Sequence, residues 1–359
     1  MADYLNHIKI MVFEPDIFSN KTPIWNSIDN IDLFIDLCKN IPELYISEVS
    51  EVYYSGTFEI NSSNYKIKSL NGKTILLKKW PLGIDKNKVE NIQKLTNWLF
   101  VKNIPVPSVG LFIDDNVLFN YNESIWSFNL FNDGNYYSGE NNELESVAKI
   151  TGKLAQTLID VPASLIPELG SQYLTEDDNF IIKEMLKSRN NWSNYFGIKN
   201  ANLLNFHWNY IYQNWKSLYG KKFQLGPIVP CHFDMHPHNL ITKDGEIVAV
   251  LDFDSCKRIP AGISLAFNAL KQCRQYMSNN KVSLNSGEVI DIYFENLLSE
   301  ISFEDFSNYD FLNLSKIEVM RRICLIFRLN IIDNNSEWNH VLSIQLSHLY
   351  ESDKLFNKQ

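Results

Sequence analysis

One segment, residues 231–255, constrains this chain more than any other. Two apolar runs of strand character, residues 240–242 and 247–251, flank the pair Asp244-Gly245. Such a pair favours a type I′ turn, because both central residues of that turn need a positive φ. The segment is therefore predicted to form a tight β-hairpin that ends in polar residues.

The polar residues at the ends of this hairpin predict a metal half-site. Symmetric pairing about the turn would set Asn239 opposite Val250, with Asp252 two residues further on. Mg²⁺ prefers carboxylate, amide and water oxygens, and it keeps part of its shell for substrate phosphates. Asp234 precedes Asn239 on the same loop, where its carboxylate could accept the proton of an attacking hydroxyl. These groups indicate phosphoryl transfer rather than hydride or acyl chemistry.

At these positions the chain resembles the aminoglycoside phosphotransferase and choline kinase group, which includes type II homoserine kinases. His232, Asp234 and Asn239 match the HxDxxxxN catalytic loop of that group, and Asp252 in LDFD matches its metal-binding aspartate. The resemblance implies an ATP-dependent (or GTP-dependent) kinase that uses Mg²⁺. Asp234 would be the base, His232 would brace the loop, and Asn239 and Asp252 would bind the metal. Asp254 is a further candidate acid near the metal or the substrate.

The same resemblance implies the class of acceptor. The γ-phosphoryl group would pass to a hydroxyl of a small molecule: a sugar or amino sugar, an aminoglycoside-like antibiotic, or an amino alcohol. After the acidic turn at Asp252 the chain enters a helix within about ten residues, without a segment that could dock a peptide substrate. A small-molecule acceptor is therefore preferred to a protein.

The hydrophobic pattern changes its period along the chain. Between about residues 44 and 128, β-rich runs with hairpin signals dominate, and after Gly134 apolar residues recur at helical spacing. The resemblance implies an α+β, bilobal protein-kinase-like fold. A small antiparallel β-sheet would form the amino-terminal lobe (1–128), a hinge would follow (129–134), and the carboxy-terminal lobe (135–359) would be mainly helical. An amphipathic helix over residues 24–37, without apparent chemistry, is expected outside the first lobe.

The nucleotide-binding residues are assigned from one strand and one helix. Strand alternation in TILLKKWP puts Leu76 and Lys78 on one face. By the resemblance, Lys78 would reach the α- and β-phosphates and Leu76 would line the adenine site; Lys79 replaces Lys78 if the register is off by one. Counting back from residues 105–107, a PVP element, places Glu90 where a helix glutamate pairs with the lysine.

Two further segments would contact the nucleotide. A polar turn over residues 61–64 stands where a glycine-rich loop would cover the phosphates. Its main-chain amides, helped by the hydroxyls of Ser62 and Ser63, could bind phosphate oxygens. At the hinge, backbone groups from Asn129 to Phe131 would hydrogen-bond adenine.

Several residues depart from the family's pattern. Phe233 replaces a usually small residue, His238 replaces a glycine, and Ser264 replaces an aspartate that braces the catalytic loop; Leu158 stands at a common histidine. A non-catalytic, nucleotide-binding kinase-like scaffold is therefore kept as an alternative. The three arginines near the carboxyl end are interpreted as solvated or ion-paired, with binding of an anionic acceptor as the alternative: Arg321, Arg322 and Arg328.

Two hydrolase readings compete with the kinase. Four alternating residues would face one side of an extended strand and suggest a zinc-dependent hydrolase: His232, Asp234, His236 and His238. Pro237 would interrupt such a strand. VAVLDFDS also resembles the haloacid-dehalogenase phosphatase signature with Asp252 as nucleophile, but that motif normally opens its domain.

Composition restricts partners and compartment. The formal net charge of −9 argues against nucleic acid and anionic membrane as partners. The five cysteines show no metal-type spacing, which favours a reduced, cytoplasmic protein. The first residues lack the pattern of a secretory signal, and no run approaches about 18 apolar residues, so no membrane span is expected.

Overall fold

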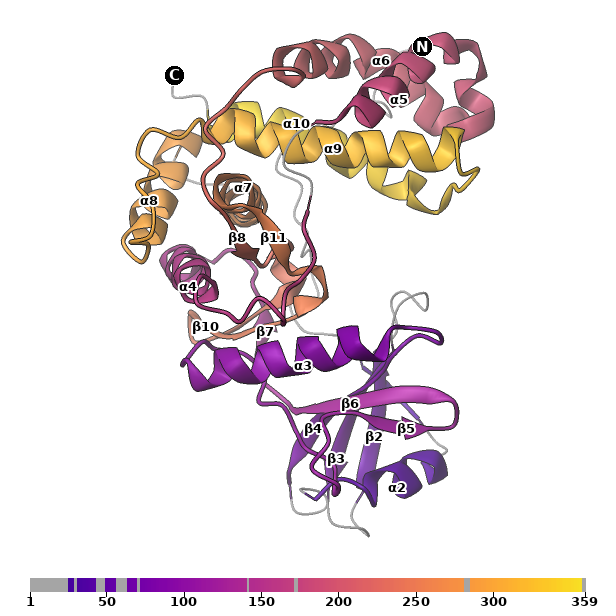
Figure 1. Ribbon diagram of the computed structural model, residues 1–359, viewed down its shortest axis with the longest axis vertical. Coiled ribbons are helices and arrows are strands. Elements are labelled where there is room, and N and C mark those ends of the chain that lie inside the picture. Colours follow the sequence, from indigo (N-terminus) through magenta and orange to yellow (C-terminus); the bar gives the residue numbers. More distant parts are fainter. Residues whose placement is uncertain are drawn as a thin grey trace.

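A computed structural model describes residues 25–28, 31–42, 49–55, 63–69, 72–140, 142–170, 174–280 and 285–356. The chain forms a sheet lobe and a helical lobe, which is the α+β class that the sequence predicts (Figure 1). No helix in these ranges is long and apolar enough to cross a bilayer.

The first lobe is built on a six-stranded antiparallel sheet in the order β1-β2-β3-β4-β6-β5. Its strands are β1 (Asn26–Ser27), β2 (Val49–Ser55), β3 (Ser63–Ser69), β4 (Thr74–Lys79), β5 (Phe119–Tyr121) and β6 (Ser124–Leu130). Ile75 and Leu77 of β4 are fully buried with Trp126 and Phe128 of β6. Alternation therefore leaves Leu76 and Lys78 on the opposite face, as predicted.

Two helices accompany this sheet. Helix α3 (Lys86–Val101) lies between the sheet and the second lobe (Figure 1), and Asp85 caps its first turn by accepting a hydrogen bond from the Asn87 amide. Helix α2 is only Asp32–Cys38, so the helix predicted over residues 24–37 is wrong in its first part. There Asn26 and Ser27 pair with β2 as a strand, and sheet pairing overrides the helical spacing.

The second lobe is mainly helical. Its helices are α4 (Glu143–Leu158), α5 (Glu176–Lys187), α6 (Trp192–Leu218), α7 (Ala261–Asn279), α8 (Ser286–Leu298), α9 (Phe311–Ile331) and α10 (Leu342–Phe356). Every residue of α7 from Ala261 to Tyr276 is buried, because α4, α8, α9 and α10 all pack against this helix. Polar residues on α7 must therefore find partners inside the protein.

Two small sheets hold the segment of residues 231–255. One has the order β10-β9-β7, from β7 (Asn135–Tyr136), β9 (Leu240–Lys243) and β10 (Glu246–Val250); the other pairs β8 (Ile228–Cys231) with β11 (Lys257–Pro260). Two 3₁₀ turns, Pro237–Asn239 and Phe253–Ser255, follow β8 and β10. Both functional loops therefore leave short strands at the lobe boundary.

The β9–β10 hairpin has the predicted turn but a different register. Asp244 and Gly245 have φ values of 53° and 85°, as a type I′ turn requires. A bulge between Ile247 and Ala249 shifts the pairing, so that Val250 faces Leu240 and not Asn239. Asn239 instead accepts a hydrogen bond from the Leu251 amide at 2.8 Å, which brings it one residue nearer to Asp252.

Candidate active site

A cavity of about 280 Å³ lies between the lobes and collects residues from both. The sheet lobe contributes β4 and α3, and the helical lobe contributes the two functional loops. Six of its lining residues carry polar groups that matter for the chemistry: Lys78, Gln93, Asn129, Asn239, Asp252 and Asp254. An adjoining apolar pocket is lined by Leu76, Leu130 and Phe131 among others.

Lys78 joins the two lobes electrostatically. Its Nζ lies 3.4 Å from Asp254 Oδ2 and 3.8 Å from Asp252 Oδ1, and it stacks over the Trp80 ring at 3.9 Å. Asp252 adopts a left-handed conformation with a φ of 61°, which turns the chain sharply after β10. A cation from β4 thus lies beside two carboxylates that are 174 and 176 residues away in the sequence.

The predicted ion pair between Lys78 and Glu90 is not formed. Glu90 pairs with Lys94, one turn along the same helix, at 2.7 Å. The rotation of α3 about its axis instead turns Gln93 and Thr96 into the cleft. Gln93 is 4% exposed, and its Oε1 has no hydrogen-bond partner among the described residues.

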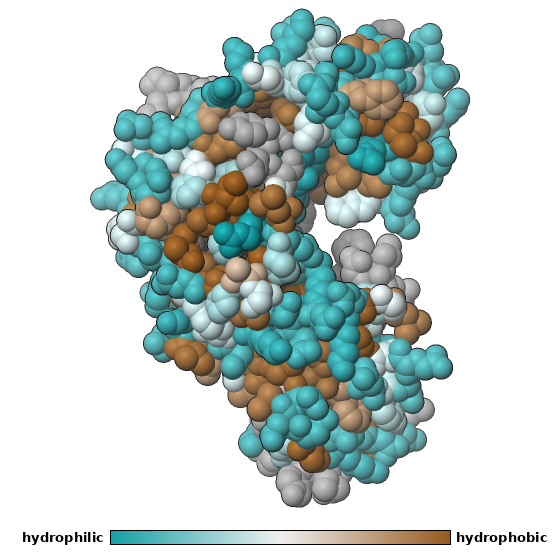
Figure 2. Space-filling view, in the orientation of Figure 1, coloured by the Kyte–Doolittle hydropathy of each residue, from teal (hydrophilic) through white to brown (hydrophobic). Residues whose placement is uncertain are grey.

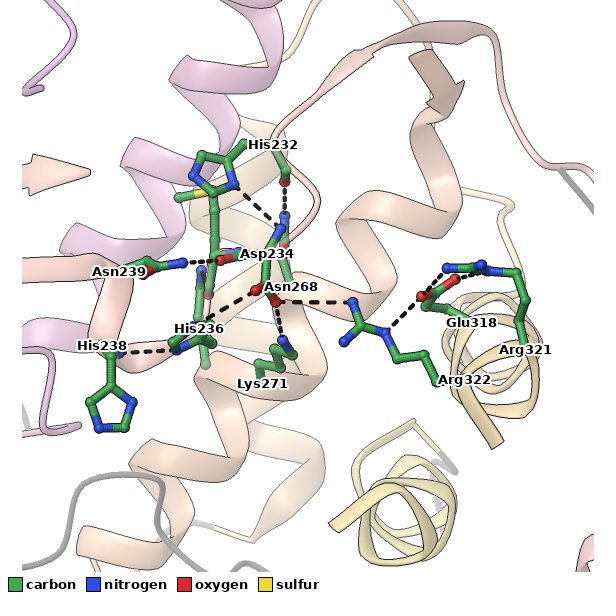
Figure 3. A network of polar contacts seen from close by, with 12 residues as sticks. His232, Asp234, His236, His238, Asn239, Asn268, Lys271, Glu318, Arg321 and Arg322 are labelled. Atoms are coloured by element: carbon green, nitrogen blue, oxygen red, sulfur yellow. Dashed lines mark hydrogen bonds and ion pairs between the residues drawn. The ribbon is translucent and has the colours of Figure 1, made fainter. Parts of the chain in front are cut away.

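The loop that matches the HxDxxxxN motif, residues 232–239, is held in shape by hydrogen bonds from its own side chains (Figure 3). Asn239 Nδ2 donates to the Asp234 carbonyl at 2.9 Å, so the amide oxygen of Asn239 is the atom that a cation could bind. His232 Nε2 donates to the Leu251 carbonyl at 2.8 Å, and its Nδ1 accepts from the Asp234 amide at 3.3 Å. Burial lowers the pKa of His232, which fits this neutral tautomer.

The structure does not support a zinc site on the histidines of this loop. Both ring nitrogens of His232 are engaged with the backbone, so neither is left for a metal. Among the described residues, no group of three or more His, Cys, Asp or Glu side chains could hold a metal ion. His236 instead lies with Nε2 at 3.7 Å from Asp234 Oδ2.

Cations surround the Asp234 carboxylate (Figure 3). Lys271 of α7 donates to Oδ1, Arg322 of α9 lies 4.0 Å from the same oxygen, and His236 approaches the other. Burial acts to raise the pKa of Asp234, but the charges of Lys271, His236 and Arg322 outweigh it and hold the pKa well below the ordinary value. These cations therefore favour the ionised form of this carboxylate.

The oxygen donors around Asp252 suit a hard divalent cation. Burial raises the pKa of Asp254, although Lys78 opposes that shift, and Asp254 Oδ1 is buried without a hydrogen-bond partner among the described residues. An unpartnered buried carboxylate oxygen is costly unless a cation or donor reaches it. With Asp252 and the Asn239 amide oxygen it makes a set of ligands that fits Mg²⁺.

At the hinge, two of the backbone amides predicted to contact adenine already have partners. The amides of Leu130 and Phe131 donate to the carbonyls of Ser108 and Thr74, at 2.9 and 3.1 Å, so they are already used inside the sheet lobe. Asn129 lines the polar cavity, and its Oδ1 is buried without a partner among the described residues. Phe131 lines the apolar pocket. Asn129 and Phe131 thus reach the cleft through their side chains.

The polar turn over residues 61–64 is described only in part. Ser62 lies outside the described residues, and Ser63 begins β3 opposite Lys79. Trp25, from the segment in which the sequence showed no chemistry, lines the apolar pocket beside Phe131, with ring centroids 6.1 Å apart. The contribution of Trp25 had no local signal, because it depends on β1 joining the sheet.

The brace that Ser264 cannot provide comes from one turn further along α7. Asn268 Nδ2 donates to the His232 carbonyl at 3.1 Å, and Asn268 Oδ1 accepts from the Met235 amide at 3.4 Å (Figure 3). Gln272 donates to the Met235 carbonyl at 3.1 Å. Ser264 and Leu158, two of the four departures from the family pattern, line one small cavity behind the loop. The loop is thus held by Asn268 and Gln272, which the sequence analysis missed.

Replacing Asn268 with leucine is expected to lower the free energy of unfolding by about 1–3 kcal/mol, because it leaves a buried carbonyl and a buried amide unpaired. It should also lower kcat more than it raises KM for nucleotide, since the loop carrying Asp234 loses its support. Urea unfolding and steady-state kinetics measure the two effects. Ser264→Ala, one turn earlier on the same helix, is the control; equal losses in both variants would contradict the assignment.

A buried histidine predicts the acid sensitivity of the fold. His348 of α10 has neither ring nitrogen hydrogen-bonded among the described residues, and burial, together with Arg274, Lys271 and Arg322, holds its pKa well below the usual value despite Asp234. The unfolded chain binds a proton below about pH 6.5 and the folded chain does not, so stability is complete above that pH and falls as pH drops.

Between pH 7 and 5 this one group is expected to remove at most about 2 kcal/mol of unfolding free energy. Urea midpoints at both pH values measure the loss. His348→Leu should reduce the difference between them, whereas His340→Leu, at an exposed histidine, should keep it. An undiminished difference in His348→Leu would show that other groups cause the sensitivity.

With this geometry in place, comparison with known proteins identifies the family. The model of the phosphotransferase enzyme family (APH) matches residues 58–267, more than half of the chain. This chain belongs to the phosphotransferase enzyme family. The resemblance inferred from the catalytic loop is thereby confirmed, and the protein is a phosphotransferase. No curated protein sequence matches the chain significantly.

Solved structures agree on the fold. A spectinomycin phosphotransferase in complex with ADP and spectinomycin has a TM-score of 0.63 at 14% identity, covering 94% of this chain and 96% of that one. An amicoumacin kinase with AMP-PNP, Ca²⁺ and Ami has a TM-score of 0.56 at 12% identity (91% and 94%). A choline kinase from Cryptosporidium parvum has 0.54 at 15% (90% and 96%). The bilobal protein-kinase-like fold is therefore confirmed.

Proposed function

We propose that this phosphotransferase transfers the γ-phosphoryl group of ATP to a hydroxyl of a small molecule. The observation that carries the proposal is the meeting of both lobes at one cavity, where Lys78 faces Asp252, Asp254 and Asn239. The side chain of Asn239 in turn donates a hydrogen bond to the backbone carbonyl of Asp234. Lys78 can bind phosphate, the oxygen ligands can hold a metal ion, and Asp234 can act as a base. Phosphoryl transfer requires these three functions.

The chain's own residues divide the work. Lys78 binds the nucleotide phosphates, and Asp234 orients the acceptor hydroxyl and takes its proton. The acceptor oxygen forms a bond to the γ-phosphorus while the bond from that phosphorus to the β,γ-bridging oxygen breaks, and ADP leaves. His232 and Asn268 hold the loop, so that the Asp234 carboxylate keeps one position through the reaction.

Asn239, Asp252 and Asp254 are the residues that would hold Mg²⁺. When bound, the ion would neutralise charge on the β- and γ-phosphates. The orphaned Asp254 Oδ1 supports this assignment. The complexes of related folds with ADP and with AMP-PNP and Ca²⁺ support nucleotide and divalent-cation binding in the same way.

The lobe boundaries and the compartment are part of the same proposal. We take residues 1–128 as the nucleotide-binding lobe, 129–134 as the hinge and 135–359 as the catalytic and acceptor-binding lobe. The five cysteines are all buried and unpaired, which supports a reducing, cytoplasmic environment. Because the pocket beside Leu76 is mainly apolar, the proposal covers GTP as well as ATP.

ADP formation tests the proposal directly. The protein is incubated with ATP or GTP, Mg²⁺ and a panel of hydroxyl compounds, and ADP or GDP is followed by a coupled assay. Turnover that depends on both the acceptor and Mg²⁺ is the expected result. Nucleotide-induced thermal stabilisation without turnover on any acceptor would favour the non-catalytic scaffold, and the absence of both would overturn nucleotide binding altogether.

A further inference from the structure

Four cationic side chains gather around the rings of Phe233 and Phe267, and two of them reach the Asp234 carboxylate. They come from three separate elements of the helical lobe, namely β11, α7 and α9: Lys257, Lys271, Arg321 and Arg322. Lys271 and Arg322 reach Asp234 itself, and Arg321 lies beside Arg322 on the same carboxylate, Glu318 (Figure 3). We call these four residues the cationic cluster.

Two buried rings organise the cluster. Phe233 lies 5.1 Å from Lys257 Nζ, and 6.0 and 5.7 Å from the guanidinium carbons of Arg321 and Arg322. Phe267 contacts Lys271 and Arg322, at 4.7 and 4.4 Å. Aromatic faces attract cations and hold guanidinium planes in place. Phe233 stands where the family usually has a small residue, and here its ring makes cation–π contacts with three of the four cations.

The cluster has more positive than negative charge. Asp234 is shared by Lys271 and Arg322, and Glu318 is shared by Arg321 and Arg322, so each of these carboxylates faces two cations. Glu318 is 2% exposed and is shared by both arginines. Asp178 and Glu168 act on Arg321 and Lys257 only from longer range. This excess runs against the net charge of −9 of the whole chain.

Lys257 could bind an anion without breaking an existing ion pair. It is half-buried and has no carboxylate within 4.0 Å among the described residues. Burial, with the neighbouring Arg321 and Arg322, lowers the pKa of Lys257, and an anion nearby would relieve that cost. The side chains of Arg321 and Arg322 are 25% and 23% exposed, so a solute can reach them.

The acceptor must lie next to these residues. A base has to come within hydrogen-bond reach of the hydroxyl whose proton it accepts, and Asp234 is the base of the proposed reaction. On the side shown in Figure 2 the molecule is concave between the helical end that holds α5, α6 and α9 and the sheet lobe below it. An acceptor bound at Asp234 therefore places its other substituents in the field of the cationic cluster.

We propose that the acceptor carries an anionic group, a carboxylate or a phosphate monoester, close to the hydroxyl that is phosphorylated. This inference rests on the proposed phosphotransferase function. The planar forks of Arg321 and Arg322 match such oxyanions, and Lys257 adds a point charge. An ammonium group in the same place would be repelled by the like charges of the cluster. The acceptor class thus shifts from amino sugars and amino alcohols to hydroxy acids, sugar acids and phosphorylated alcohols.

Matched compounds that differ in one group provide the test. Gluconate, glucitol and 1-amino-1-deoxyglucitol share a chain and differ at one carbon, as do glycerate, glycerol and 3-amino-1,2-propanediol; glycerol 3-phosphate adds a phosphate monoester. Their dissociation constants are measured by calorimetry at constant ionic strength with AMP-PNP and Mg²⁺ present, which fills the phosphate site at Lys78. We expect at least one acid to bind tenfold or more tightly than its neutral twin, and the amine to bind most weakly.

Substitutions assign the preference to the cluster. Lys257→Gln should reduce the preference for the acid about tenfold and leave the neutral twin unchanged, and Arg322→Gln should reduce the same preference. Arg328→Gln, at an exposed position of the same helix α9, should keep it. Lys257→Gln is decisive if Arg322→Gln does not fold, because Lys257 has no ion pair to lose. The inference is overturned if no acid binds more tightly than its neutral twin, or if the preference survives in Lys257→Gln.

The same samples separate this inference from the function on which it rests. Thermal stabilisation by AMP-PNP and Mg²⁺ reports nucleotide binding without any acceptor. Binding of nucleotide with turnover of a neutral or cationic acceptor in preference to every acid would keep the phosphotransferase and overturn the anionic acceptor. Failure to bind nucleotide would overturn the proposed function, and the acid-to-neutral ratio would still decide the charge preference of the cluster.

Discussion

Asp234→Asn is expected to lower kcat by about 100- to 10,000-fold, the contribution typical of a positioned general base. The amide keeps the shape of the side chain but cannot take the proton of the acceptor hydroxyl. KM for ATP should change little, because Lys78 and the Asp252 region, which are proposed to hold the nucleotide, are untouched. Steady-state ADP formation measures both constants.

The control for this variant is Asp244→Asn in the β9–β10 turn, where asparagine also tolerates the observed φ of 53°. It makes the same chemical change outside the cleft and should keep the wild-type kcat. Circular dichroism and thermal melting show whether Asp234→Asn remains folded, since Lys271 loses an ionised partner in this variant. A folded Asp234→Asn variant with wild-type kcat would remove Asp234 as the base.

Lys78→Met is expected to lower kcat/KM for ATP by about 100- to 1,000-fold, comparable to the loss of one preorganised donor at a site of developing charge. Methionine keeps the length of the stem and its packing over Trp80, but it removes the charge that faces Asp252 and Asp254. Nucleotide affinity should fall as well, which calorimetry with AMP-PNP measures.

Lys79→Met makes the same change one residue later on β4. Lys79 projects toward Trp126, 5.8 Å from its ring centroid, and does not line the cleft cavity. We expect nearly wild-type kinetics from this control. If Lys79→Met were the inactive variant and Lys78→Met the active one, the register of β4 relative to the cleft would be wrong.

The local features of the site could be predicted because each depends on a short stretch of chain. The Asp244-Gly245 turn follows from the φ that its two residues tolerate. The placement of Leu76 and Lys78 on the cleft face follows from strand alternation next to a buried Ile75 and Leu77. The loop motif itself led to the family, which the family comparison confirms.

Two predictions, the ion pair of Glu90 and the register of the hairpin, are wrong, each for a local reason. Glu90 was assigned by counting along the sequence, but the angle at which α3 docks on the sheet decides which of its residues faces the cleft, and that residue is Gln93. The register of the hairpin shifted because one bulge is enough to move a pairing by one residue. Neither docking angle nor bulge has a clear signal in the residues concerned.

Asn268 and Lys271 had a weak signal that was not used. Polar residues recur along α7 at spacings of three and four among the apolar residues of the helix: Asn268, Lys271, Gln272 and Gln275. On a helix buried on all sides, such a stripe has to be satisfied by neighbouring groups. The stripe could have predicted a polar contact, but not that its partners are the catalytic loop.

The fold class, the family, the hairpin and the chemistry of the loop can thus be inferred from short stretches of chain, because turn dihedrals, strand alternation and motif spacing act over a few residues. The surroundings of Asp234 depend instead on how distant elements pack. Lys271 lies 37 residues from it in the sequence, and Arg322 reaches it from a third element, α9. Such charges meet only when β11, α7 and α9 pack around one loop, and their sum, rather than the motif, indicates an anionic acceptor.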